Sequence, residues 1–302
     1  MAHMVVKLKA FSLLLILLIF LAACSSAPQR PSEVFTNRNT AANQLSLANY
    51  TASQGHFHDA LTILEEARRL ALITDDPALR INTAISKGNI LFSLEQYEEA
   101  FSLWESAARE GEAFSQPLLA SRARMYAIQA ELILLANDPD PLASDSKATL
   151  LRTQITEELA ILARDPIFAA AGFVTLALAE KHLKAWQEAE AATRRALAIH
   201  EKNHLLEDAA YDWFIIASIR SVAENFDGAL EALQMAIHFD RRAENAFGLA
   251  SAWHATGDVY RKSARHEEAL AAYQRAEDIY RAMGHTEQAD ELQVLSSTLL
   301  TH

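Results

Sequence analysis

Two histidines separated by three residues form the pattern with the clearest chemical meaning in this sequence. His200, Glu201 and His204 match H-E-x-x-H. In that spacing two imidazoles on one face of a continuous helix bind zinc, and the glutamate acts as general base. A metal-dependent hydrolase needs the helix to run unbroken between the histidines and needs a third ligand. Glu207 and Asp208 are near, but neither is a compelling third ligand.

The rest of the sequence offers little for catalysis. Cys24 is the only cysteine, which excludes a disulfide, a thiolate metal cluster and a thiol relay. The sequence contains no glycine-rich phosphate loop and no nucleophile elbow. The formal charge of −12 becomes −14 without residues 1–23, which disfavours nucleic acid as a partner. We therefore expect a protein that is not an enzyme and uses neither a metal nor a cofactor.

The N-terminus has the features of an export signal. Lys7 and Lys9 precede an apolar run over residues 10–23, about the length of a signal-peptide hydrophobic region and short for a membrane span. The run ends in Leu-Ala-Ala-Cys at residues 21–24. This ending resembles the lipobox of bacterial lipoproteins.

The resemblance implies that a lipoprotein signal peptide, residues 1–23, is removed and that Cys24 is acylated, with palmitate among its acyl chains. Residues 24–40 are polar and would form a flexible tether. Ser25 follows the cysteine where inner-membrane retention requires Asp, so we expect an outer-membrane lipoprotein that faces the periplasm. The alternative is an ordinary secretory signal that is cut nearby.

A pattern of large and small residues in the stretch 249–283 recurs through much of the chain. It reads W-x3-G-x2-Y and then A-x3-Y-x2-A. This order resembles the tetratricopeptide repeat (TPR), in which small residues let two antiparallel helices approach and large ones fill the gaps. The residues are Trp253, Gly257, Tyr260, Ala269, Tyr273 and Ala276.

Alanines set the period of this pattern. Ala60, Ala100, Ala189, Ala229 and Ala269 are separated by 40, 89, 40 and 40 residues, and each is followed seven residues later by another alanine. The gap of 89 equals two periods and nine further residues. We therefore predict one degenerate repeat that carries an insertion.

Prolines support the same register. Pro77, Pro117 and Pro166 are 40 and 49 residues apart, and each follows Asp or Gln, as is typical of a first helical turn. The turn formers of residues 137–145 fit the insertion. We predict an all-α, right-handed superhelical solenoid of about six TPR-like hairpins with a C-terminal capping helix. The solenoid would span 41–302, with hairpins at 41–77, 78–116, 117–165, 166–207, 208–246 and 247–284 and the cap at 285–302.

The register also bears on the two histidines. His204 aligns with Gly284, the residue after the last turn of the corresponding helix. The helix that carries His200 should therefore end before His204. We expect both histidines to interact with the negative end of that helix instead of binding zinc.

The family resemblance implies a concave groove lined by positions 2, 5, 9, 12 and 13 of each first helix. Leu45 and Ile85 stand at position 5, where a chaperone-type carboxylate clamp needs Lys, so we do not expect binding of chaperone tails. The N-terminal hairpins offer apolar and amide groups, and the C-terminal ones offer aromatics and cations. The expected partner-binding residues are Asn49, Asn89, Phe92, Lys181, His182, Tyr211, Phe214, Ser218, Ser221, His254, Asp258, Arg261 and Lys262.

These features favour a membrane-anchored scaffold that binds a protein or peptide in its groove and helps assemble or localise a cell-envelope complex. The alternative is a periplasmic transport accessory that acts with a solute-binding protein or a small organic ligand. An open groove would favour the scaffold, and an enclosed apolar pocket would favour the accessory.

Overall fold

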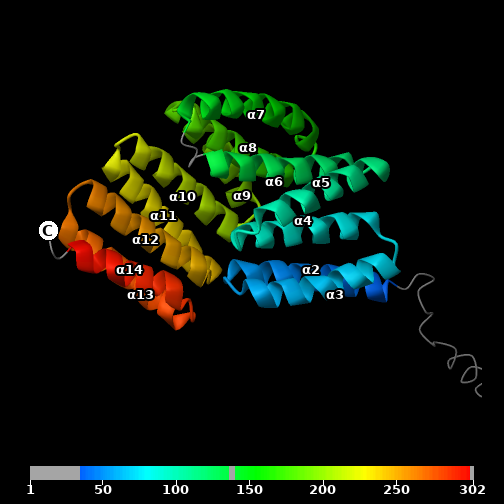
Figure 1. The fold of residues 1–302 in the computed structure, drawn as a ribbon, viewed down its shortest axis with the longest axis horizontal. Helices are drawn as coiled ribbons and strands as arrows, with labels where there is room; N and C mark the ends of the chain where they lie inside the picture. Colours follow the sequence, from blue (N-terminus) through cyan, green and yellow to red (C-terminus); the bar gives the residue numbers. More distant parts are fainter. Residues whose placement is uncertain (1–34, 136–139, 300–302) are drawn as a thin grey trace, which may run out of the picture. The chain divides into compact units, whose positions relative to one another are not determined.

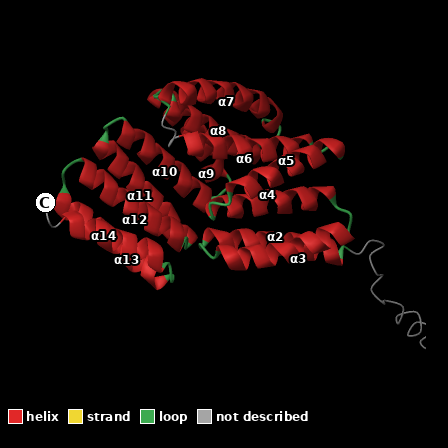
Figure 2. Ribbon diagram, viewed as in Figure 1, coloured by secondary structure: helices red, strands yellow, loops and turns green. Residues whose placement is uncertain are grey.

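Short turns join the helices of the computed structural model, which describes residues 35–135 and 140–299 (Figures 1 and 2). Within those residues there are thirteen helices and no strand. The predicted signal peptide, Cys24 and most of the predicted tether lie outside the described residues. The predicted tether is wrong over residues 36–40, because α2 begins at Thr36. The helices are α2 (Thr36–Ser53), α3 (Phe57–Ile73), α4 (Pro77–Ser93), α5 (Tyr97–Ala113), α6 (Pro117–Leu135), α7 (Pro141–Leu162), α8 (Pro166–His182), α9 (Trp186–Lys202), α10 (Leu206–Val222), α11 (Phe226–Ala243), α12 (Ala246–Lys262), α13 (His266–Ala282) and α14 (Thr286–Leu299).

None of the helices in the described part of the chain has both the length and the apolar character needed to cross a membrane.

Most connections between helices share one backbone conformation. A residue with positive φ stands in the middle of the turn, such as Glu95 (φ 61°), Glu224 (φ 60°) and Ala264 (φ 59°). One such left-handed residue ends a helix within about one turn and sends the chain back antiparallel. Repetition of this turn makes the helices into successive hairpins.

The predicted alanine register is confirmed by burial. Ala60, Ala100, Ala189, Ala229 and Ala269 are fully buried, and the alanines seven residues after them are buried as well. Each pair lies two turns apart on the second helix of a hairpin, so both face the same side. Only small side chains fit where the two helices approach this closely.

Glycine permits the closest approaches between paired helices. A Cβ placed on Gly88 of α4 would lie 2.5 Å from Nε1 of Trp104 on α5, and one on Gly257 of α12 would overlap the ring of Tyr273 on α13. The two pairs have the same spacing in sequence, and both aromatic rings are buried. The large ring takes the volume that the glycine leaves free.

The third hairpin, α6 and α7, carries the nine additional residues in a way that the sequence analysis did not predict. Helix α6 has 19 residues and α7 has 22, whereas α4 and α5 have 17 each. Seven of the nine residues therefore extend the two helices, and two lengthen their connection. The predicted turn over 137–145 is wrong at its C-terminal side, because α7 begins at Pro141 behind the capping carboxylate of Asp140. Residues 136–139 lie outside the described part.

Candidate binding surface on the first helices

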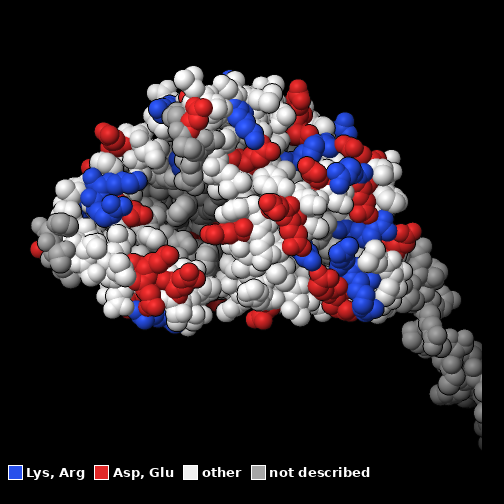
Figure 3. Space-filling model, viewed as in Figure 1, with Lys and Arg blue, Asp and Glu red and all other residues white. Residues whose placement is uncertain are grey.

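The first helices of neighbouring hairpins contact one another. Contacts join α4 to α6, α6 to α8 and α10 to α12. A solenoid is tighter on the side where its repeats touch, so the first helices line the concave side. Figure 3 shows charged side chains of both signs across one face of the molecule, which is hollowed near its middle.

Several of the predicted binding residues meet between α10 and α12. Phe214, Ser218 and Ser221 of α10 and Asp258 and Lys262 of α12 line a cavity of about 180 Å³. Phe214 and Ser218 are partly buried, and they lie one turn apart on the same face of α10. Lys181 of α8 joins this group, because its Nζ donates to Ser218 Oγ at 2.6 Å.

Arg261 and Asp258 form a closed network with α13. Arg261 donates to Asp258 Oδ1 and to the Tyr273 hydroxyl, both at 3.2 Å, and the hydroxyl donates to Asp258 Oδ1 at 2.8 Å. Burial, together with its hydrogen bond to Asp258, raises the pKa of Tyr273 to about 12. His254 Nε2 is 3.8 Å from the other oxygen of Asp258. The charge of Arg261 is therefore balanced within the fold.

Three other predicted groove residues are held by side chains of the fold. Asn89 accepts a hydrogen bond from Trp104 Nε1 at 3.1 Å, and the ring of Phe92 packs against Trp104. His182 Nε2 is hydrogen-bonded to Ser144 Oγ at 2.8 Å, on the part of α7 that the additional residues create. Asn49 is exposed on α2.

A second cavity, of about 330 Å³, lies where α6, α8 and α10 meet and was missed by the sequence analysis except for Tyr211. Arg122 lies over the rings of Tyr126 (5.6 Å to the centroid) and Phe168 (5.1 Å). Tyr211 is 45% exposed, but its hydroxyl is hydrogen-bonded to Gln129, and desolvation of this group raises the pKa of the tyrosine. Arg122, Tyr126 and Gln129 are spaced by four and three residues, the spacing of one helical face. That spacing was the available signal, but the degenerate repeat obscured the groove positions of α6.

The two histidines of H-E-x-x-H do not share a helix face. Helix α9 ends at Lys202, and His204 lies beyond it with φ of 57°. The predicted break in the helix is therefore confirmed. His200 lies in the last turn of α9, where the prediction places it. In addition, its Nδ1 is 2.7 Å from Oδ2 of Asp212 on α10, and both residues are buried. Within the described chain, no group of three or more His, Cys, Asp and Glu side chains could hold a metal ion.

The first hairpin contacts the last hairpin, α12 and α13, and the turn between α13 and α14. The rings of Phe57 and Phe247 are 6.2 Å apart, edge to face, and those of His56 and His285 are 6.3 Å apart. A Cβ on Gly55 would lie 2.6 Å from His285 Nε2. Figure 1 shows α2 and α3 beside the ends of α12 and α13. These contacts bridge the concave side, which no repeat pattern predicts, because the contacting residues are 190 to 230 positions apart in the sequence.

A scan of protein-family models finds no match to the sequence, and a search of curated proteins finds none either. Solved structures do resemble the fold. BtubC (BKLC) from P. vanneervenii superposes with a TM-score of 0.51 and 17% identity, covering 81% of this chain and 92% of that one. A Rap protein complexed with Competence and Sporulation Factor gives 0.54 and 16%, covering 85% and 74%.

A signal-transduction ATPase with a TPR sensor, from Pyrococcus horikoshii, gives a TM-score of 0.56 and 14% identity, covering 89% of this chain. This match includes only 44% of the ATPase. At these identities the likeness concerns the fold alone. The protein is thus a TPR-like solenoid of helical hairpins, as the sequence pattern predicts.

Proposed function

We propose that this protein is a membrane-anchored scaffold that holds a protein or peptide segment against its first helices, at α10 and α12. The observation that carries the proposal is the cavity between these helices. It brings together five side chains whose positions the repeat pattern assigns to the groove. Phe214 supplies an aromatic anchor, and anchors of this kind dominate the affinity of typical interfaces. The rigid hairpins hold the surface in place before a partner arrives.

The anchor in this proposal is the acylated Cys24, and the location is the periplasmic side of the outer membrane. The support is the Leu-Ala-Ala-Cys sequence at residues 21–24. Labelling of cells with a fatty-acid analogue should mark the protein, and the Cys24→Ala variant should carry no label. Persistent labelling of that variant would show that the protein is anchored elsewhere or in another way.

Partner capture tests the binding surface. The Phe214→Ala variant should recover far less partner than the natural protein from crosslinked native membranes. The matched control, Glu98→Lys with Glu99→Lys, changes two exposed residues on α5 and should capture normally. Circular dichroism must show the same helical content in both variants. If the Phe214→Ala variant captures normally and the α5 variant does not, the partner binds the convex side.

The bridge between the ends of the array favours a second candidate, a transport accessory that encloses a small organic ligand. Arg122, Tyr126 and Tyr211 would then hold the ligand in the cavity of about 330 Å³. Native mass spectrometry of protein purified from its own host should show a small adduct that Arg122→Ala removes. The scaffold requires no such adduct, so the two candidates are separable by this measurement.

A further inference from the structure

Two lysines approach each other on the concave side without a compensating acid. Lys181, in the last turn of α8, and Lys262, the last residue of α12, extend toward α10 from opposite sides. Among the described residues, neither ammonium lies within ion-pair distance of a carboxylate. Burial lowers the pKa of Lys181, and the positive charge of Lys262 lowers it further. The two lysines therefore place positive charge close together in a chain with a formal charge of −12.

Two serines on α10 lie between these lysines. Ser218 Oγ accepts from Lys181 Nζ at 2.6 Å, and Ser221 Oγ accepts from Lys262 Nζ at 3.4 Å. Most other serine and threonine hydroxyls on these helices donate back to a carbonyl one turn earlier, as Thr175, Ser251 and Thr256 do. No such bond is formed by Ser218 or Ser221 in the described structure, so their hydroxyl protons remain available to an acceptor.

The other charged groups around Lys181, Lys262 and the two serines already have partners. Asp258 lines the same cavity as Lys262, but its oxygens face Arg261, His254 and the Tyr273 hydroxyl. His182, next to Lys181, is bonded to Ser144. Lys181, Lys262, Ser218 and Ser221 therefore offer two ammonium groups and two hydroxyl protons, with no carboxylate among them.

We propose that Lys181, Ser218, Ser221 and Lys262 form a binding site for carboxylate groups, supplied by acidic residues of the segment that the scaffold holds. The inference rests on the proposed function, because it names the chemistry of the partner at that surface. A carboxylate accepts several charge-assisted hydrogen bonds at once, and lysine and serine donors suit it. Bound there, it would relieve the repulsion between the two ammonium groups and raise the pKa of Lys181.

Titration calorimetry with hexaglutamate at low ionic strength tests the site, with hexaglutamine as the uncharged counterpart. The natural protein should bind hexaglutamate and not hexaglutamine, and added salt should weaken the binding. Lys181→Met and Lys262→Met keep most of each stem and remove the charge. Each should weaken hexaglutamate binding roughly tenfold or more. The control Lys202→Met removes an exposed charge on α9 and should bind as the natural protein does.

Thermal unfolding separates this site from a purely structural role. If the lysines only stabilise the ends of their helices, Lys181→Met will unfold at a lower temperature and bind hexaglutamate unchanged, which overturns the proposal. Equal weakening by Lys202→Met would show nonspecific attraction and overturn it too. Binding of inorganic phosphate at these lysines without hexaglutamate binding would rule out carboxylate as the ligand. None of these results bears on partner capture through Phe214, which the capture experiment from crosslinked membranes measures separately.

Discussion

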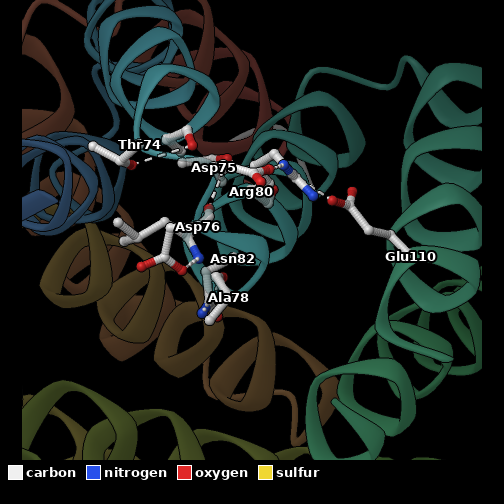
Figure 4. A network of polar contacts seen from close by, with 10 residues as sticks. Thr74, Asp75, Asp76, Ala78, Arg80, Asn82 and Glu110 are labelled. Carbon is white, nitrogen blue, oxygen red and sulfur yellow. Dashed lines mark hydrogen bonds and ion pairs between the residues drawn. The ribbon is translucent and has the colours of Figure 1, made fainter. Parts of the chain in front are cut away.

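Successive hairpins pack against one another differently in the two halves of the molecule. One position near the end of the second helices faces the following hairpin. It holds Ala71 and Gly111 in the N-terminal half but His200, Asp240 and Tyr280 in the C-terminal half, and all five are buried. In the N-terminal half the polar contacts lie around this position instead. Figure 4 shows Arg80 between Asp75 and Glu110, which it contacts at 2.5 and 2.6 Å.

The difference has energetic consequences. At Gly111 an added Cβ would lie 2.9 Å from the backbone nitrogen of Ala120, so this position depends on volume and holds no buried polar group. At His200 and Asp240 the junction depends on hydrogen bonds and on protonation. Buried polar groups cost free energy whenever a partner is missing or a charge forms. The C-terminal junctions should therefore respond to pH, and the N-terminal ones should not.

The largest effect is expected from His200→Ala. This change leaves Asp212 fully buried without its partner, and its Oδ1 already lacks a hydrogen bond in the described structure. Loss of one partner of a buried pair typically costs about 3–5 kcal/mol of unfolding free energy. Burial already raises the pKa of Asp212 to about 6. Urea unfolding at about pH 8 should show the full loss, and at about pH 5 a smaller one, because the carboxyl is then protonated.

The double variant His200→Leu, Asp212→Leu is the control for this pair. Replacement of both members by apolar residues should recover most of the stability and remove its pH dependence, because no buried charge remains. An equal loss at both pH values in His200→Ala would mean that packing, and not ionisation, governs this junction.

Asp240→Asn should have a smaller effect of the opposite sign. Burial raises the pKa of Asp240 to about 7, although Asn245 donates to Oδ1 at 2.8 Å; the charge of Glu207 raises it too. The folded state therefore binds a proton that the unfolded state releases near pH 4, so stability falls as the pH rises from about 4 through about 7. Asparagine cannot ionise, so it should add about 1–3 kcal/mol at about pH 8 and little at about pH 5. A gain that is the same at both pH values would contradict this account.

The repeat pattern predicts the fold well because the packing it encodes is local. The alanine pairs, the proline caps and the break between His200 and His204 each depend on residues within one hairpin or its neighbour. The cavity between α10 and α12 follows from the same spacing, as Phe214 and Ser218 illustrate. Periodicity of this kind states which side of a helix is buried before any long-range contact is known.

What the pattern misses depends on contacts outside the period. The extension of α7 covers His182 because five of the nine additional residues lengthen this helix. The pairing of His200 with Asp212 needs the three-dimensional junction, because a spacing of twelve residues has no meaning in a single helix. The contact of Phe57 with Phe247 requires the accumulated curvature of the whole array.

Gly111→Ala should have the smallest net effect and tests the N-terminal side of the comparison. The methyl group would meet the backbone of Ala120 on α6, which cannot rotate away as a side chain can. Overpacking of this kind typically costs about 1–3 kcal/mol, and the better helix propensity of alanine returns up to about 1 kcal/mol. We expect a net loss of about 1 kcal/mol of unfolding free energy that is the same at about pH 5 and about pH 8.

The matched control is Gly172→Ala on α8, where the added Cβ meets Cδ2 of Leu159, the end of a flexible side chain. That variant should lose less than Gly111→Ala or gain stability, because Leu159 can move aside. Equal losses at the two glycines would mean that close backbone approach does not set the N-terminal junctions apart.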